Sequence, residues 1–246
     1  MASRRDSSFL KGLSLPSEIA TGDAASHAEV PAAFDEASRN GVNGDEVSAT
    51  EAIECFFDLA LKELSALRSA MEVDAIADAA NLILEREAAG GRVHVTGIGK
   101  SEHVARYTAS LLSSTGTPAY FLHATECVHG SAGQVREVDV AIAISNSGTT
   151  PELMNAVHAL RDLGVKVIGV SGDRRSPLAG VADVLLYVGV NNEGGVLNLV
   201  PRSSILAKIL VLGALSVALE SHKGLTRQQY ARWHPGGVLG KLARGE

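Results

Sequence analysis

From Arg92 onward, short apolar runs alternate with longer stretches in which apolar residues recur at helical spacing. The short runs are rich in valine and isoleucine and are nearly continuous, which predicts strands buried on both faces. The longer stretches predict helices that cover the sheet. This alternation is typical of an α/β fold with a doubly wound, mostly parallel sheet flanked by helices. The expected strands are 92–99, 118–123, 138–145, 165–172 and 183–190, and the expected helices are 101–116, 151–164, 176–182 and 203–223.

Two N-terminal helices are expected before the first strand. Ser48 and Glu51 have the spacing of a capping box, in which each side chain binds the backbone N–H of the other residue. The first helix follows this box to about residue 70, and a second is expected over 74–87. Neither carries obvious chemistry, so their apolar faces should pack on the sheet or against another subunit. The apolar stripe of the first helix consists of Ile53, Phe56, Phe57, Ala60, Leu61, Leu64 and Leu67.

Residues 1–46 differ from the rest of the chain. They are rich in serine, alanine, glycine and acidic residues and show little periodicity. Such a segment buries too little apolar surface to offset the entropy lost on ordering. We therefore expect a poorly ordered tail over 1–46 and one domain over 47–246. The basic start lacks a following apolar segment, so a targeting peptide is not expected.

Composition narrows the classes of function. The chain has 246 residues, 46% of them hydrophobic, and a net charge of −6, which argues against nucleic acid as the main partner. Its two cysteines, Cys55 and Cys127, lie far apart and have no metal-ligand spacing, as expected in a reducing cytoplasm. The longest apolar run is interrupted by Lys208 and fits a buried helix, so we expect no membrane association.

A cluster of small polar residues follows the third expected strand, just before the next helix begins at Pro151. The helix start offers unpaired N–H groups and the positive end of the dipole, and the hydroxyls add donors. Capping alone would need one or two hydroxyls, whereas four occur here, so we predict a phosphate cradle. The spacing of a nucleoside triphosphate loop is missing. The predicted cradle comprises Ser145, Asn146, Ser147, Gly148, Thr149 and Thr150.

Six short motifs follow one another along the chain: "GIGKS" (97–101), "SSTGTPAYFLH" (113–123), "ECVHG" (126–130), "AISNSGTTPE" (143–152), "VSGDRRSPLAGVADV" (170–184) and "WHPGGVLGK" (233–241). Together they resemble the sugar isomerase (SIS) domain, in particular the arabinose 5-phosphate isomerases. The resemblance covers about residues 50–244 and corresponds to a short form without the C-terminal cystathionine-β-synthase domains. It implies a flavodoxin-like fold, a phosphosugar substrate, no cofactor, and a homo-oligomer, expected to be a tetramer.

The resemblance implies four catalytic positions. Lys100 matches the lysine of the "GKS" turn and would stabilise developing oxyanion charge, although an exposed surface lysine is the alternative. Glu152 begins a helix, where an acid is favoured by the dipole in any case. Glu193 follows the last strand, close to the expected ligand edge. His234 precedes a rigid "PGG" turn and would be the acid–base that opens the sugar ring, the alternative being a hydrogen-bonded loop histidine.

The resemblance also places further residues around the substrate. Gly99 and Ser101 flank the turn lysine. Glu126 and His129 belong to a segment that lines the site in the family, and they could form an inhibitory site for a divalent metal, although no catalytic metal is expected.

Aldose–ketose isomerisation moves one proton between C1 and C2 through a cis-enediol, and it requires a base near that carbon. We assign Glu152 as this base and His234 to ring opening, with Glu193 orienting hydroxyls or sharing the proton transfer. The sequence leaves open which of the two carboxylates is the base.

The chain departs from the family pattern at several positions. Glu102 replaces a glycine, Ser131 replaces an aspartate, and "SGTT" replaces "SGES". Arg202 stands where threonine is typical and adds a permanent charge. Two alternatives therefore stay open: a non-catalytic phosphosugar-binding regulator, and an isomerase or lyase of the same fold acting on another phosphosugar.

Overall fold

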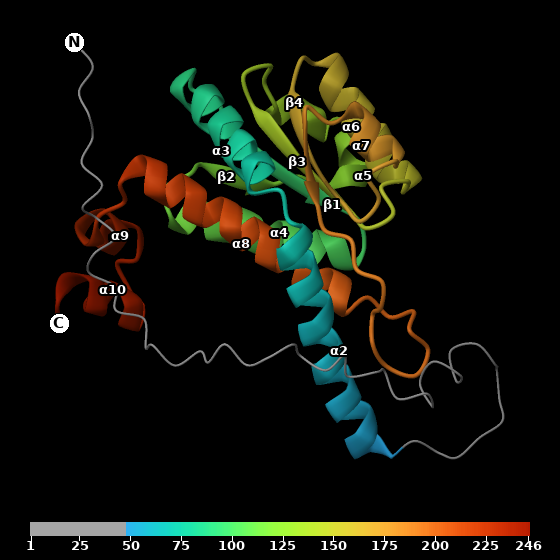
Figure 1. Cartoon of the computed structure of the whole chain (residues 1–246). Helices are drawn as coiled ribbons and strands as arrows, with labels where there is room; N and C mark the ends of the chain where they lie inside the picture. The colour runs from blue at the N-terminus through green and yellow to red at the C-terminus, as the bar shows by residue number, and fades with distance from the viewer. Residues whose placement is uncertain (1–47) are drawn as a thin grey trace, which may run out of the picture. The chain divides into compact units, whose positions relative to one another are not determined.

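The structure is a computed structural model that describes residues 48–246, drawn in colour in Figure 1. The tail expected over residues 1–46 lies outside the described residues. The domain expected from residue 47 begins, as described, with the cap of the first helix.

Five parallel strands form the central sheet in the order β2-β1-β3-β4-β5. The predicted parallel, helix-flanked sheet is therefore confirmed. Every residue of β1 and β3 is buried, which explains their continuous apolar sequence. The strands are β1 (Val93–Gly97), β2 (Ala119–Phe121), β3 (Val140–Ser145), β4 (Lys166–Ser171) and β5 (Val184–Tyr187).

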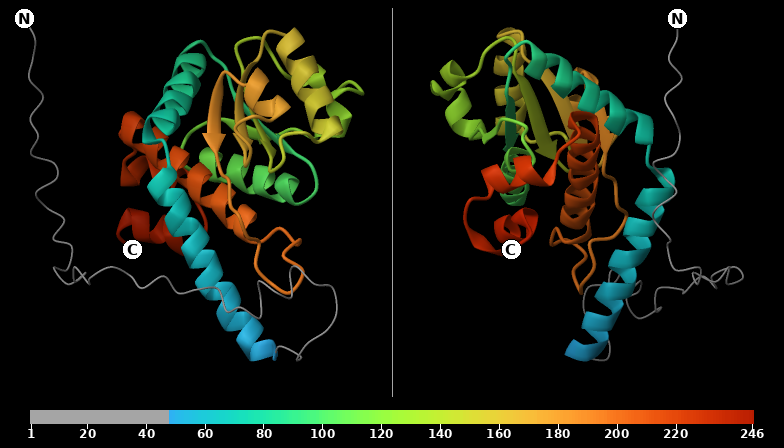
Figure 2. Two further views of the ribbon diagram at one scale, coloured as in Figure 1. Left: turned by 45° about the vertical axis from the view of Figure 1, so that its right-hand side comes forward. Right: turned by 90° about the vertical axis from the view of Figure 1, so that its left-hand side faces the viewer.

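Helices cover both faces of the sheet (Figure 2). Val140, Ile142 and Ile144 of β3 pack toward α3, α4 and α8, whereas Ala141 and Ala143 pack toward α5, α6 and α7. Each face thus has its own apolar core, as the two-residue period of a strand requires. The helices are α2 (Ala49–Ala70), α3 (Val73–Ala88), α4 (Lys100–Ser114), α5 (Ala124–Cys127), α6 (Pro151–Asp162), α7 (Pro177–Val181), α8 (Ser203–Lys223), α9 (Arg227–Trp233) and α10 (Gly237–Arg244), with a 3-10 turn at Ser131–Gln134.

The first helix confirms its predicted cap but divides its apolar stripe. Ser48 and Glu51 form the reciprocal capping box. Leu67 and Ala60 are buried, yet Ile53, Phe57 and Leu61 remain 54%, 59% and 68% exposed. The predicted apolar stripe of α2 therefore packs on the domain along one side only. Its other side stays exposed to solvent in a single copy of the chain.

The two C-terminal helices were not expected from the apolar pattern, which suggested only a turn near His234. Thr226 and Gln229 form a second capping box at the start of α9. The sequence held this signal, because threonine followed three residues later by glutamine marks a helix start. The helices are short and mostly exposed, so they lack the long apolar stripe by which the others were identified.

Helix α8 has the length and hydropathy of a membrane span, with a mean hydropathy of 1.8 over its best window. Half of that window is buried inside the domain. Its apolar residues pack with those of α3 and α4 in one core, as expected for the central helix of a folded domain.

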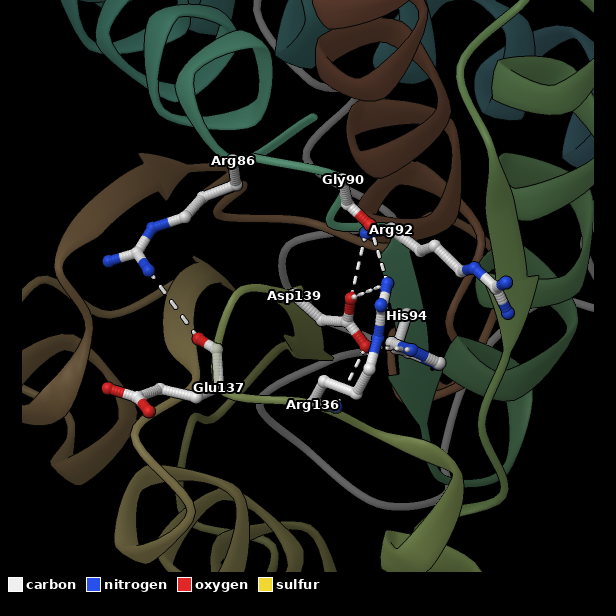
Figure 3. A network of polar contacts seen from close by, with 7 residues as sticks. All are labelled: Arg86, Gly90, Arg92, His94, Arg136, Glu137 and Asp139. Carbon is white, nitrogen blue, oxygen red and sulfur yellow. Dashed lines mark hydrogen bonds and ion pairs between the residues drawn. The ribbon is translucent and has the colours of Figure 1, made fainter. Parts of the chain in front are cut away.

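A buried polar network holds the amino-terminal edge of the sheet (Figure 3). Asp139, just before β3, accepts hydrogen bonds from the backbone N–H groups of Arg92 and Arg136, both at 2.9 Å. The Nε2 atom of His94 lies 3.1 Å from Oδ2 of the same carboxylate. Burial would raise the pKa of Asp139, but these hydrogen bonds hold that pKa below its usual value. Burial also lowers the pKa of His94, despite the neighbouring carboxylate.

Candidate active site at the carboxyl edge of the sheet

The loops after β1, β3 and β4 meet at the carboxyl edge of the sheet, opposite the Asp139 network. Because β3 is central and pairs with β1 on one side and β4 on the other, these loops are neighbours in space. In open α/β sheets this edge is where ligands bind. Most of the residues expected in the site follow these strands.

The loop after β3 folds on itself through its own hydroxyl groups. Ser145 Oγ accepts a hydrogen bond from the backbone N–H of Gly148 at 3.0 Å and lies 3.1 Å from Thr150 Oγ1. Ser147 Oγ accepts from both the backbone N–H and the hydroxyl of Thr149, at 3.3 and 2.9 Å. Thr150 is the N-cap of α6, yet its side chain makes no capping hydrogen bond. The hydroxyls therefore shape the loop instead of capping the helix, and the start of α6 has no side-chain cap from Thr150.

Gly148 is required by this geometry. Its φ of 63° lies in the left-handed region, and a Cβ there would overlap the side chain of Ser176, the N-cap of α7. Its carbonyl also accepts from the N–H of Leu178. The loop after β4 thus supports the loop after β3 from behind.

Lys100 is the first residue of α4 and is exposed to solvent. It follows Gly99, whose φ of 61° makes the sharp turn from β1. Ser101 comes next and is partly buried. Since Gly97 of β1 pairs in register with Ile144 of β3, the lysine turn and the 145–150 loop lie on adjacent strands.

The two candidate bases differ in their surroundings. Glu152 lies exposed in the first turn of α6, and its carboxylate makes no hydrogen bond within residues 48–246. Glu193 is partly buried, and its Oε2 accepts from the backbone N–H groups of Arg202 at 2.7 Å and Ser204 at 3.0 Å. Glu193 therefore caps the start of α8, a position that sequence reasoning did not foresee.

Glu126 and His129 lie at the end of α5 and just beyond it, and both are exposed. The N–H of His129 donates to the carbonyl of Glu126, which places them on one turn. Helix α5 follows β2 and packs with α6 on one face of the sheet. Within residues 48–246 no group of three His, Cys, Asp or Glu side chains is arranged to hold a metal ion.

His234 lies away from these residues. It follows Trp233, whose ring contacts Gly116 in the turn that leads into β2. That turn belongs to the amino-terminal edge of the parallel sheet, and Figure 1 shows α9 and α10 beside the far end of α8. The Nδ1 atom of His234 is 3.0 Å from the carbonyl oxygen of Tyr230, and the His234 ring stacks on the Tyr230 ring with centroids 3.9 Å apart. One copy of the domain therefore does not bring His234 to Glu152.

Sequence reasoning missed Lys208 as a site residue. It is buried in α8, and its Nζ lies 3.2 Å from Asn146 Oδ1 in the 145–150 loop. The available signal is a charge within an apolar run, which the sequence analysis uses to argue for a buried helix and against a membrane span, without assigning Lys208 to the site. Helical spacing could have placed it on the buried face beside Ala207, Val211 and Leu212.

Comparison with known proteins points to one family of α/β domains. Residues 88–218 match the SIS domain family. The chain is 44% identical over 151 residues to arabinose 5-phosphate isomerase KdsD of Escherichia coli K12, covering 61% of this chain and 46% of that protein. It is 37% identical over 185 residues to the KdsD of Francisella tularensis, covering 75% and 56%. The solved structure of E. coli CFT073 c3406 in complex with arabinose 5-phosphate superimposes with a TM-score of 0.70 and 32% identity, over 77% of this chain and 100% of that one.

These matches define a class of α/β domains that includes proteins named as sugar-phosphate isomerases. The chain belongs to the SIS domain family. It spans about half the length of the curated relatives that it matches.

Proposed function

We propose that the protein is an aldose–ketose isomerase that interconverts D-arabinose 5-phosphate and D-ribulose 5-phosphate through a cis-enediol. The relatives named arabinose 5-phosphate isomerase and the related structure with bound arabinose 5-phosphate support this substrate. The open hydroxyl loop at the carboxyl edge supports phosphate binding, because an anion there gains the N–H groups and dipole of α6.

The contrast between the two carboxylates carries the assignment of the base. Glu193 accepts hydrogen bonds from two backbone N–H groups, which fix the position of its carboxylate. Glu152 is exposed beside the phosphate loop and makes no hydrogen bond within the described residues. We therefore assign proton transfer between C1 and C2 to Glu152, and to Glu193 the positioning of the loop at residues 193–204.

Lys100 is suited to stabilise the oxygen on which charge develops. Its position at the start of α4 puts a mobile cation on the strand next to the phosphate loop. A positioned cation at that oxygen lowers the barrier, because it interacts more strongly with the enediolate than with the neutral carbonyl.

His234 has the chemistry of a ring-opening base, but it would have to come from a second copy of the chain. Since the Tyr230 carbonyl can only accept, Nδ1 donates to it, and in a neutral imidazole Nε2 is then the nitrogen left to accept a proton. The uncovered apolar residues of α2, together with Val238, Leu239 and Leu242 of α10, offer surfaces for self-association. We accordingly propose a homo-oligomer, a tetramer, whose site combines residues of two copies.

The departures from the family pattern are compatible with the same substrate. Glu102 is paired with Arg106 on its own helix, at 2.9 Å. Arg202 donates through its guanidinium to the carbonyl of Gly194 at 2.8 Å, so it stabilises its own loop. We propose a cytoplasmic enzyme without organic cofactor or catalytic metal, and without nucleic acid or membrane partners.

Substitution of Glu152 by glutamine tests the proposal. Glutamine keeps the size and helix position of the side chain but accepts no proton, so exchange of solvent deuterium at C2 should fall at least about 100-fold. Calorimetry should show nearly unchanged binding of D-arabinose 5-phosphate. Glu102→Gln is the matched control, an acid in the first turn of the neighbouring helix, and it should exchange at the wild-type rate.

Two outcomes would overturn the proposal. If the wild-type protein binds phosphosugars tightly but exchanges no proton with any of them, it is a binding protein and not an isomerase. If Glu152→Gln exchanges at the wild-type rate, Glu152 is not the base and Glu193 takes its place.

A further inference from the structure

Lys208 lies directly behind the phosphate loop, in the second turn of α8. Its side chain is 1% exposed. Its Nζ donates to Asn146 Oδ1 at 3.2 Å, the one hydrogen bond that it makes within residues 48–246. One turn earlier, Ser204 is fully buried, and neither its hydroxyl nor that of Ser203 has a hydrogen-bond partner among the described residues. The first two turns of α8 thus present incompletely satisfied polar groups toward the loop side of the core.

This arrangement is costly if it serves only the fold. A buried ammonium loses its hydration, and here it recovers a single neutral acceptor. Burial lowers the pKa of Lys208 to about 8, with Glu193 acting in the opposite direction. An apolar side chain of similar length would avoid these costs.

The contact determines which way the Asn146 amide faces. An ammonium group can only donate, so the atom it contacts must be the amide oxygen. The backbone carbonyl of Asn146 is held as well, since it accepts from the N–H of Gly172 at 2.8 Å. With Oδ1 turned toward α8, the Nδ2 atom and its two N–H groups are directed away from the core, on a residue that is exposed at the loop.

We propose that Lys208 is a positioning and specificity-determining residue for the phosphate of the ligand. Its ammonium turns the Asn146 amide so that the N–H groups face the phosphate, and its buried charge favours the phosphate dianion over the monoanion. This inference rests on the phosphosugar site proposed above and adds a residue outside the loop to it. Lys208 does not touch the ligand and acts through Asn146.

The charged groups around Lys208 set the expected pH dependence. Glu193, from the loop before α8, raises its pKa. Glu63 of α2 binds Asn191 and Asn192 in the same loop, each at 2.8 Å. Lys100 of α4 lies on the exposed side, while Glu87 of α3 pairs with Lys223 at the opposite end of α8. Affinity should therefore peak between the second ionisation of phosphate, at about pH 6, and the deprotonation of Lys208 near pH 8.

Lys208→Met provides the test, with D-arabinose 5-phosphate and inorganic phosphate as separate calorimetric probes. The Kd for both should rise about 10- to 100-fold, the range for losing an interaction with a charged group. The KM should rise in step while kcat changes less than about threefold. Wild-type affinity should fall above pH 8, whereas the variant should show no such fall. The melting temperature should be unchanged or higher, because a buried charge has been replaced by an apolar group.

Two further variants separate the possible causes. Lys223→Met removes a lysine from the same helix at its far end, and it should lower stability without changing phosphate affinity. Lys208→Gln keeps a donor without the charge, so it should restore part of the affinity but not the loss above pH 8. It also serves as the test if the methionine variant does not fold.

An unchanged Kd and pH profile in both Lys208 variants, with wild-type binding intact, would overturn the role of Lys208 and leave the isomerase standing. Equal losses in kcat and melting temperature would show a merely structural lysine. Failure of the wild-type protein to bind either probe would instead refute the phosphosugar site itself, and this inference with it.

Discussion

The two edges of the sheet use similar polar residues in opposite ways. At the amino-terminal edge, Asp139 is fully buried and its carboxylate is satisfied by two backbone N–H groups and the His94 ring. At the carboxyl edge, Glu152 and Lys100 are exposed, and the hydroxyls after Ser145 bind mainly one another. Polar groups that satisfy one another hold strands together, whereas groups left open can bind a ligand. The difference in partners, more than the residue types, separates structure from function here.

Asp139 and Lys208 show the same contrast inside the core. Both are buried ionisable groups close to the ends of β3. Asp139 meets three donors, so its charge is stabilised without any ligand. Lys208 meets one amide oxygen, so its charge is only partly compensated until an anion approaches. The polar groups of the amino edge are satisfied by the protein itself, whereas under the proposed function those of the carboxyl edge are satisfied by the ligand.

His234 is an exception to this contrast between the two edges, because it is a candidate catalytic residue that lies at the amino edge. We expect Glu152→Gln and His234→Asn each to lose at least about 100-fold in rate, because each removes a proton-transfer group. Mixing the two inactive variants under conditions that exchange subunits should restore activity, since some sites would then combine an intact Glu152 with an intact His234. Turnover of D-arabinose 5-phosphate before and after mixing checks this. No recovery in demonstrably mixed oligomers would argue against a shared site.

Asp139→Asn should have the largest effect on stability. The amide nitrogen would replace one of the two oxygens and face a backbone N–H donor, that of Arg92 at Oδ1 or that of Arg136 at Oδ2. We therefore expect a loss of about 3 kcal/mol in the free energy of unfolding. Asp183→Asn is the matched control at the same edge. It binds the N–H of Val167 at 2.8 Å but is partly exposed, and it should cost about 1 kcal/mol. Denaturant unfolding measures the free energy of unfolding of both variants. A loss of turnover in a variant that remains folded would contradict the purely structural role of the amino edge.

The same network should make the protein sensitive to acid. His94 has a lowered pKa when folded, so the unfolded state binds more protons once the pH falls below about 6.5, and stability decreases. Asp139 also has a lowered folded pKa, so its contribution is present above about pH 4 and is lost as the pH falls further, through its folded pKa. Unfolding curves measured between pH 8 and 3 test this. The Asp139→Asn variant should lack the loss of stability that occurs below about pH 4.

Changes in the phosphate loop should affect binding more than stability. Ser147→Ala and Thr150→Ala each remove a hydroxyl at the open edge, and each should raise KM by the equivalent of about 1–2 kcal/mol with little change in kcat. The melting temperature should hardly move, because neither hydroxyl bonds outside the loop. A fall in kcat at constant KM would place the loop in the chemistry instead.

The smallest effect is expected from deleting residues 1–45. Their sequence lacks the apolar periodicity that could offset the entropy of ordering. Turnover and melting temperature should match those of the whole chain. A loss of most activity, or a large fall in melting temperature, would show that this segment belongs to the fold.

Local sequence patterns predict the sheet, most helices and the polar loop at residues 145–150. These follow from local patterns, because buried parallel strands are continuously apolar and helices repeat every 3.6 residues. The polar loop at residues 145–150 is recognisable for the same reason, since the strand, the loop and the helix start are consecutive in the chain. The short helices α9 and α10 were not predicted, because they bury little apolar surface and have no long apolar stripe.

The hydrogen-bond partner of each polar group, in contrast, depends on the folded structure. Glu193 and Glu152 look alike in the sequence, yet one caps α8 and the other is open to solvent. Asn146 and Lys208 are 62 positions apart and meet only because α8 returns to the carboxyl edge of the sheet. His234 follows α8 to the opposite edge, which removes it from the site of its own copy. Hydrogen bonds and burial depend on contacts between distant segments, and these are determined only once the chain has folded.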